Sequence, residues 1–184
     1  GIVISIDWVY EYQPHDTYLY ELLKPYGFTF PVVKEIVRSL DTFSGKIFYS
    51  STHRLLRDRE NFIIQSLSEL KTEQESEEDF QLERGVLNIQ YPVCICTHET
   101  DQIADLPMGK ASIACLDMDK LKFPLTLRKW EKGDWFMPLG LKGKKKLSDF
   151  FVDQKLSLAE KEKIWLLVSG KDIVWVIGKR IDNR

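Results

Sequence analysis

The densest group of basic side chains in this 184-residue sequence lies between two aromatic pairs, Trp135-Phe136 and Phe150-Phe151. Four lysines occupy five consecutive positions there, and they surround one glycine. These residues are Lys142, Gly143, Lys144, Lys145 and Lys146. Glycine lets the backbone approach a ligand closely, and a lysine ammonium binds phosphate as a point charge. Ser148-Asp149 predicts the start of a short helix, whose N-terminus also favours anions. The stretch therefore predicts a surface that grips phosphates, with a merely solubilising loop as the alternative.

Further basic residues flank this loop in the sequence. Arg128, Lys129 and Lys132 precede it, and Lys179, Arg180 and Arg184 follow it. If the last strand lies near the loop, these groups form one positive face that contacts the phosphates of a nucleic acid rather than its bases. A structured RNA helix is recognised mainly in this way. The predicted binding residues are Lys142, Lys144, Lys145, Lys146, Arg128, Lys129, Lys132, Lys179 and Arg180.

Charge is distributed unevenly along the chain, although the formal net charge is only -2. Residues 120–184 contain 16 of the 26 Lys and Arg residues but only 8 of the 28 Asp and Glu residues. The last third is therefore basic and the remainder acidic, which favours a nucleic-acid contact at one end. Two solvated surfaces of opposite charge would have the same composition.

Five aromatic residues lie near the basic loop and could stack on bases. They are Trp130, Trp135, Phe136, Phe150 and Phe151. Their alternation with polar residues indicates instead that most of them form the inner face of a sheet.

Motifs for nucleotide activation are not found in the sequence. Gly45-Lys46 is followed by Ile47, and Leu40 stands where a P-loop needs its first glycine. The histidines His15, His53 and His98 are scattered, with no nucleophile placed by a motif. We therefore expect no catalytic residue and no cofactor site in this chain.

Cys94, Cys96 and His98 raise the alternative of a metal site. Same-face neighbours on a strand lie ~7 Å apart, whereas zinc holds its ligands at ~2.0–2.3 Å. We therefore expect buried apolar thiols and no metal. Three cysteines do not make a disulfide framework, which indicates a reducing, cytoplasmic setting. No apolar run approaches the ~18 residues of a membrane span, so no membrane partner is expected.

Two patterns divide the chain. Residues 14–24 and the segment opened by Pro31 have helical apolar spacing, whereas strand-like runs dominate from Lys46 onward. We predict an α+β fold, with a helical middle domain over residues 1–45. A mixed, mostly antiparallel β domain with inserted short helices is expected over residues 46–184. Residues 71–79 contain no hydrophobic side chain and predict a flexible acidic loop within that domain, not a boundary.

Motifs at both ends are similar to bacterial tRNA(Ile)-lysidine synthetases. Gly133-Asp134-Trp135-Phe136, Pro138-x-Gly140, Lys145-Lys146-Leu147-Ser148-Asp149-Phe150-Phe151-Val152-Asp153 and Trp175-Val176-x-Gly178-x-Arg180-Ile181-Asp182 resemble the C-terminal domain of that family. Leu19-Tyr20-Glu21-Leu22-Leu23-x-x-Tyr26-Gly27-Phe28 and Ser44-Gly45-Lys46-x-Phe48-x-Ser50 resemble its middle region. Residues 68–110 match weakly.

The resemblance implies a cytoplasmic ligase that adenylates the wobble cytidine of isoleucine tRNA with ATP and then joins lysine to it. The product, lysidine, switches decoding from AUG to AUA. In the family, catalysis, ATP and Mg belong to an N-terminal domain with a Ser-Gly-Gly-x-Asp-Ser motif, which this sequence lacks. The chain is thus expected to follow that catalytic domain and to hold the tRNA, near the acceptor stem.

The implied partners are tRNA(Ile) and the protein's own N-terminal catalytic domain. A scaffolding or homodimerisation module of the same enzyme is the alternative to tRNA recognition. A self-contained enzyme is not expected.

Overall fold

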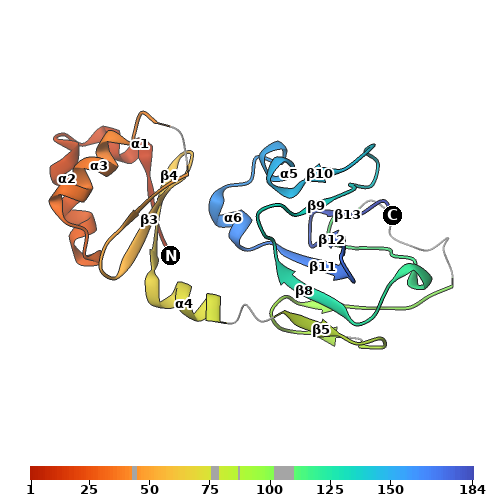
Figure 1. The fold of residues 1–184 in the computed structure, drawn as a ribbon. Coiled ribbons are helices and arrows are strands. Elements are labelled where there is room, and N and C mark those ends of the chain that lie inside the picture. The colour runs from red at the N-terminus through yellow and green to blue at the C-terminus, as the bar shows by residue number, and fades with distance from the viewer. Residues whose placement is uncertain (43–44, 76–78, 87, 102–109) are drawn as a thin grey trace. The chain divides into compact units, whose positions relative to one another are not determined.

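The computed structural model describes residues 1–42, 45–75, 79–86, 88–101 and 110–184. Its contacts divide the chain into two compact units, Gly1–Ser76 and Glu77–Arg184 (Figure 1). Each unit combines helices with antiparallel sheet, which confirms the predicted α+β class. Among the described residues, no helix is long and apolar enough to cross a membrane.

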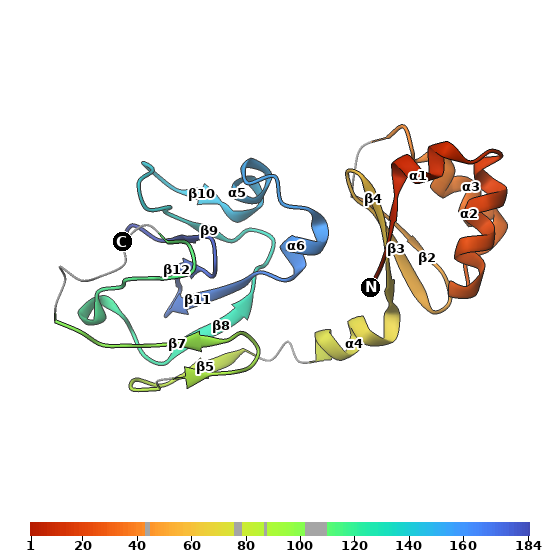
Figure 2. The same cartoon turned by 180° about the vertical axis from the view of Figure 1, so that it is seen from behind.

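The first unit is a four-stranded antiparallel sheet with α1, α2 and α3 on one side, and α4 continues from the end of the sheet, as Figures 1 and 2 show. The strand order is β1 (Ile2–Ser5), β4 (Asn61–Ser66), β3 (His53–Arg57) and β2 (Lys46–Tyr49). The helices are α1 (Ile6–Glu11), α2 (His15–Leu23), the 3-10 turn η1 (Lys24–Tyr26), α3 (Phe30–Arg38) and α4 (Leu67–Glu75).

Local sequence signals explain the helix boundaries in this unit. Pro31 stands in the first turn of α3, where its missing N–H costs nothing. Gly27 ends η1 in the left-handed region at φ +79°, a conformation that side chains with a Cβ rarely adopt. The two predicted helices over residues 14–24 and after Pro31 are therefore confirmed.

The division between the units differs from the boundary expected at residue 45. Strands β2 to β4 complete the first unit, because Leu55 and Phe62 pack in one core with Leu23 and Ile36 of the helices. Short helices cannot bury their apolar faces alone, so the sheet supplies the missing partner.

The segment expected to be an acidic loop, residues 71–79, also differs in the structure. Helix α4 continues to Glu75, and the two units divide between Ser76 and Glu77. Residues 76–78 lie outside the described residues. The absence of apolar side chains does not prevent a solvated helix, because Glu, Lys and Gln are good helix formers.

The second unit is built on a five-stranded antiparallel sheet. Its order is β13 (Arg180–Ile181), β12 (Asp172–Val176), β11 (Trp165–Ser169), β8 (Leu125–Lys129) and β5 (Phe80–Leu82). Two small ribbons pair β9 (Trp135–Phe136) with β10 (Lys145–Lys146), and β6 (Asn88–Ile89) with β7 (Ile95–Cys96). The helices are η3 (Met118–Lys120), α5 (Leu147–Asp153) and α6 (Leu158–Glu162).

Both faces of this sheet are covered. Leu166 and Val168 of β11 join a core with Phe136 and the side chains of α5, whereas Leu167 between them joins a second core with Trp175. This alternation is what a strand buried on both faces requires. Strands β11 and β12 form an antiparallel hairpin, and Ser157 and Glu160 form a capping box at the start of α6.

Candidate nucleic-acid interface

The basic loop connects β9 to β10, which pair with Phe136 opposite Lys145 and Trp135 opposite Lys146. Phe136 is fully buried in the core and anchors one end of the loop. Gly143, in the middle of the loop, has φ +87°, and no atom lies within 4 Å of the position where a Cβ would stand. Lys142 and Lys144 on either side of it are exposed. The loop therefore presents its lysines from a fixed base.

The chain just before the loop is tied to the C-terminal strand. Leu139 N donates to Ile181 O at 2.9 Å, and Asn183 N donates to Met137 O at 2.7 Å. Arg180 Nη1 in turn donates to Leu139 O at 3.0 Å. These contacts place the last strand beside the chain that enters the basic loop, which was the condition for one positive face.

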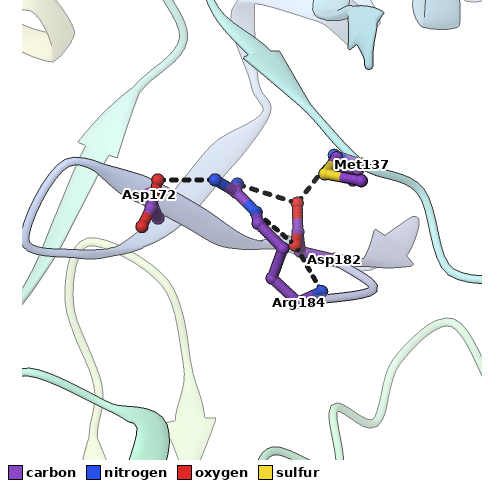
Figure 3. A network of polar contacts seen from close by, with 4 residues as sticks. All are labelled: Met137, Asp172, Asp182 and Arg184. Carbon is purple, nitrogen blue, oxygen red and sulfur yellow. Dashed lines mark hydrogen bonds and ion pairs between the residues drawn. The ribbon is translucent and has the colours of Figure 1, made fainter. Parts of the chain in front are cut away.

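A buried carboxylate organises the same region, as Figure 3 shows. Asp182, whose side chain is only 4% exposed, accepts hydrogen bonds from Met137 N at 2.7 Å and from Arg184 N and Nε, each at 2.8 Å. Burial alone would raise the pKa of Asp182, but these hydrogen bonds and the Arg184 charge hold it below its ordinary value. The Arg184 guanidinium also donates to Asp172 Oδ1 at 2.5 Å.

Trp135 is the exposed aromatic residue of this face. Its side chain is 37% exposed, while its neighbour Phe136 is buried, because adjacent residues of β9 point to opposite sides. Lys144 Nζ lies 3.9 Å from the centroid of the Trp135 ring, and the Arg184 guanidinium carbon lies 5.0 Å from it. Trp130, Phe150 and Phe151 belong to the core or pack against it, as expected for most of the aromatic group.

Arg128 is placed differently from the loop lysines. It forms a two-pronged ion pair with Asp134, with both Nη atoms donating at 2.8 Å. Burial alone would raise the pKa of Asp134, but the hydrogen bonds from Arg128 and from the Glu131 N–H lower it. Arg128 therefore closes the turn that leads into β9, and its guanidinium is already occupied.

Lys129 and Lys145 also have intramolecular partners. Lys129 Nζ donates to Glu162 O at 2.8 Å and lies 4.5 Å from the centroid of the Trp165 ring. Lys145 is ion-paired with Asp153 of α5. Lys129 thus connects β8 to α6, and Lys145 connects β10 to α5.

The remaining predicted residues differ in exposure. Lys132, Lys146 and Arg180 are exposed, and Lys179 is half-buried in the turn between β12 and β13. The structure therefore joins the loop to β13 through Arg180 and Leu139. It shows no contact that ties Lys132 or Lys179 to the loop within the part of the chain it describes.

Trp135 and Arg184 were left out of the final set of predicted binding residues, although Arg184 was counted in the positive face and Trp135 among the aromatic residues that could stack on bases. Trp135 was expected among core aromatics, and a two-residue strand gives too little alternation to reveal its outward direction. Arg184 stands apart from any motif, and only the fold brings it to Trp135.

Two smaller expectations about this unit were wrong. The predicted short helix is present as α5, but its N-cap is Lys146 rather than Ser148 or Asp149, and the Leu147 N–H donates to Asp134 O. Cys94 and Cys96 are exposed rather than buried, because β7 turns Ile95 inward. Among the described residues, no group of three His, Cys, Asp or Glu side chains could hold a metal ion.

Lysine side chains like those exposed on this loop are among the groups that contact phosphate oxygens in protein–nucleic acid complexes. Residues 1–67 match the family model described as "TilS substrate binding domain", and residues 125–184 match the one described as "TilS substrate C-terminal domain". Together these matches cover more than half of the chain, which therefore belongs to the TilS family. The resemblance drawn from the sequence motifs is thereby confirmed.

Relatives of this chain share its sequence over almost its whole length. It is 48% identical over 184 residues to a tRNA(Ile)-lysidine synthase of Parabacteroides distasonis, and 36% identical over 183 residues to one of Bacteroides thetaiotaomicron. These alignments cover 98% of this chain but only 40% and 39% of the relatives, so the chain spans about two fifths of their length. A crystal structure of a TilS C-terminal domain has a TM-score of 0.43 and 19% identity, covering 57% of this chain and 83% of that one.

Proposed function

We propose that this chain is the tRNA-holding part of a tRNA(Ile)-lysidine synthase. That enzyme uses ATP to join lysine to the wobble cytidine of isoleucine tRNA. The family membership and the names of the relatives support this assignment. Catalysis, with ATP and Mg, then belongs to the part of the relatives that this chain does not span, and that part is a partner of the two units described here.

The observation that carries the proposal for this chain is the basic loop between β9 and β10. Lys142 and Lys144 are exposed on this loop and Lys146 is exposed in β10 at its end, and the loop is fastened to the core and to β13. A loop whose backbone is already held in place loses little backbone freedom when phosphates bind. We propose that this loop contacts phosphates of the tRNA body and acceptor stem.

The other predicted residues divide into two roles in this proposal. Arg180 lies at the edge of the loop and contributes to phosphate contact, with Lys132 and Lys179 as outlying contacts. Arg128, Lys129 and Lys145 keep their intramolecular partners and hold the loop in place.

A salt titration of tRNA binding tests this function. The 184-residue chain is titrated with isoleucine tRNA and with a mismatched tRNA at several salt concentrations. The test variant is Lys142→Glu/Lys144→Glu/Lys146→Glu. The matched control reverses three exposed lysines elsewhere, Lys46→Glu/Lys71→Glu/Lys110→Glu, and so has the same net charge.

We expect the loop variant to bind at least tenfold more weakly than the control. Its plot of log affinity against log salt should be less steep by about 3, because each lost phosphate contact removes roughly 0.9 from the slope on a duplex. Equal behaviour of the two variants would remove the loop from the interface. If the native chain does not bind tRNA at moderate salt and its mass depends on concentration, the dimerisation alternative takes precedence.

A further inference from the structure

A cavity of about 380 Å³ opens beside the C-terminal strand of the second unit. Apolar side chains form much of its wall, and they come from the chain around η3, from the segment before the basic loop and from β12 and β13. They are Ile113, Leu116, Leu121, Leu139, Val174 and Ile181. Ile113 and Leu139 are also 39% and 41% exposed. A concave apolar wall with a few polar groups is the usual form of a small-ligand site.

The charged groups of the wall balance one another. They are Asp117, Asp172, Asp182, Lys120, Lys122 and Arg184. Lys120 lies 3.6 Å from Asp117, and Asp182 is occupied by Arg184 and the Met137 N–H. Equal numbers of positive and negative charges disfavour a phosphate inside the cavity. The wall suits a flat, neutral ligand that carries hydrogen-bonding groups.

Asp172 is the wall carboxylate with accepting capacity for such a ligand. Its Oδ1 accepts from Arg184, and its side chain is 42% exposed. A carboxylate can accept about four hydrogen bonds, so capacity remains beyond the bond to Arg184. An amino group on an aromatic ring is the natural donor to this position, and a ring carbonyl there would be repelled.

The cavity borders the basic loop. Leu139 lines the cavity and stands three residues before Lys142. Arg184 belongs to the cavity wall and also lies 5.0 Å from the centroid of Trp135, the ring that Lys144 covers. The cavity wall and the basic loop thus share the segment around Leu139 and the Arg184–Trp135 contact.

We propose that this cavity binds one unpaired nucleobase of the bound tRNA and prefers a base with an exocyclic amino group. Cytosine N4 or adenine N6 donates to Asp172, in the same way that carboxylates read cytosine elsewhere. The aliphatic side chains Leu139 and Val174 contact the faces of the ring. The inference rests on the proposed function, because the nucleotide comes from tRNA held on the loop.

Mononucleotides with the same phosphate but different base edges test this site. Cytidine 5′-monophosphate (CMP) and uridine 5′-monophosphate (UMP) are titrated into the 184-residue chain, with amide chemical shifts as the readout. We expect CMP to bind with a dissociation constant on the order of 1 mM, about −4 kcal/mol. UMP should bind about tenfold more weakly, because its O4 accepts hydrogen bonds and faces a carboxylate.

Two variants connect the binding to the cavity. Asp172→Asn should abolish the preference for CMP, because an amide can donate to uracil as well as accept from cytosine. Asp149→Asn makes the same chemical change on the exposed side of α5 and should keep the preference. Leu139→Trp places a large ring at the rim of the cavity, where the native side chain is already exposed. Because this ring obstructs the cavity, the variant should bind both CMP and UMP at least tenfold more weakly.

Competition with tRNA identifies the source of the base. Saturating isoleucine tRNA should displace CMP from the cavity. CMP that stays bound in that mixture would overturn the assignment to a tRNA base. The assignment would also fail if CMP did not bind at a concentration ten times the expected dissociation constant. Equal affinity for CMP and UMP would also overturn it, as would binding that Leu139→Trp leaves unchanged. The loop variant Lys142→Glu/Lys144→Glu/Lys146→Glu separates the two proposals, since it should weaken tRNA binding while CMP binding persists.

Discussion

Lys144 Nζ lies 3.9 Å from the centroid of the Trp135 ring, so a loop lysine covers the exposed aromatic residue of the same face. A cation over an indole at an exposed site is worth about 0.5–1 kcal/mol. The contact restricts one of the most flexible side chains of the loop. Lys144 is thereby presented to a phosphate in a defined place, whereas Lys142 must be ordered when the ligand binds.

Replacing Trp135 distinguishes the ordering of the Lys144 side chain from the effect of its charge on tRNA binding. Trp135→Leu removes the ring under Lys144 but no charge, and we expect tRNA affinity to fall about threefold, in line with the cation–π energy. The salt slope should stay unchanged in this variant, whereas Lys144→Gln should lower it by roughly 0.9. Fluorescence anisotropy with labelled tRNA at several salt concentrations measures both quantities. An unchanged affinity for Trp135→Leu would contradict the ordering role.

Asp182 should be important for the stability of the second unit. Its side chain is 4% exposed and accepts hydrogen bonds from Met137 N and from several Arg184 nitrogens. Asp182→Asn removes the charge and places an NH2 group among donors, so we expect a loss of about 2 kcal/mol. Urea unfolding followed by circular dichroism measures the change. The exposed control Asp149→Asn should stay within ~0.5 kcal/mol, and an equal loss in both variants would refute the assignment.

Acid should destabilise the second unit through Asp134 as well as Asp182. The pKa of each carboxyl is lowered in the folded chain, because hydrogen bonds from arginine and backbone N–H groups outweigh the effect of burial. The unfolded chain therefore takes up protons first as the pH falls. The stabilisation is present above the ordinary aspartate pKa of about 4 and is lost as the pH falls through the lower folded values.

The measurement for this pH dependence is urea unfolding at a series of pH values between neutral and acid. Asp134→Asn should show a shallower decline below about pH 4 than the native chain, because one linked proton is removed. If native and variant curves stay parallel throughout, Asp134 does not contribute to the acid sensitivity.

Phe136 should anchor the basic loop through the core. It is fully buried and its ring centroid lies 5.1 Å from that of Phe150. Phe136→Ala should cost about 3–5 kcal/mol of folding free energy, the usual range for a buried phenylalanine. Thermal unfolding checks this value against Leu141→Ala, a truncation at a 48% exposed loop position that should change little. Similar melting temperatures for the two variants would show that the loop does not depend on this anchor.

Local patterns in the sequence were sufficient for much of the secondary structure. Pro31 and Gly27 bound the helices of the first unit, Ser157 and Glu160 cap α6, and the turn at Gly170 closes the β11–β12 hairpin. These features depend on neighbours within a few residues, so the sequence alone contains their physical cause. The family motifs are likewise short runs of neighbouring residues, so they could be recognised in the sequence alone.

Long-range pairing decided what the sequence left open. Strand β1 pairs with β4, which lies more than fifty residues further along the chain. Strands β2 to β4 therefore belong to the first unit, and the two units divide after Ser76 rather than at residue 45. A change from helical to strand pattern marks a change of element, but only the shared core shows which elements form one unit.

The candidate interface shows the same distinction at the level of side chains. The type and spacing of residues 142–146 determined that a basic, glycine-containing loop exists. Only the tertiary structure decided which cations already have a partner, because Arg128 is ion-paired with Asp134 and Lys145 is ion-paired with Asp153. The fold also brought Arg184 to Trp135 and to the cavity wall. Sequence determines the charges available, and packing determines which of them already have partners, because an ion pair depends on distances that no local pattern encodes.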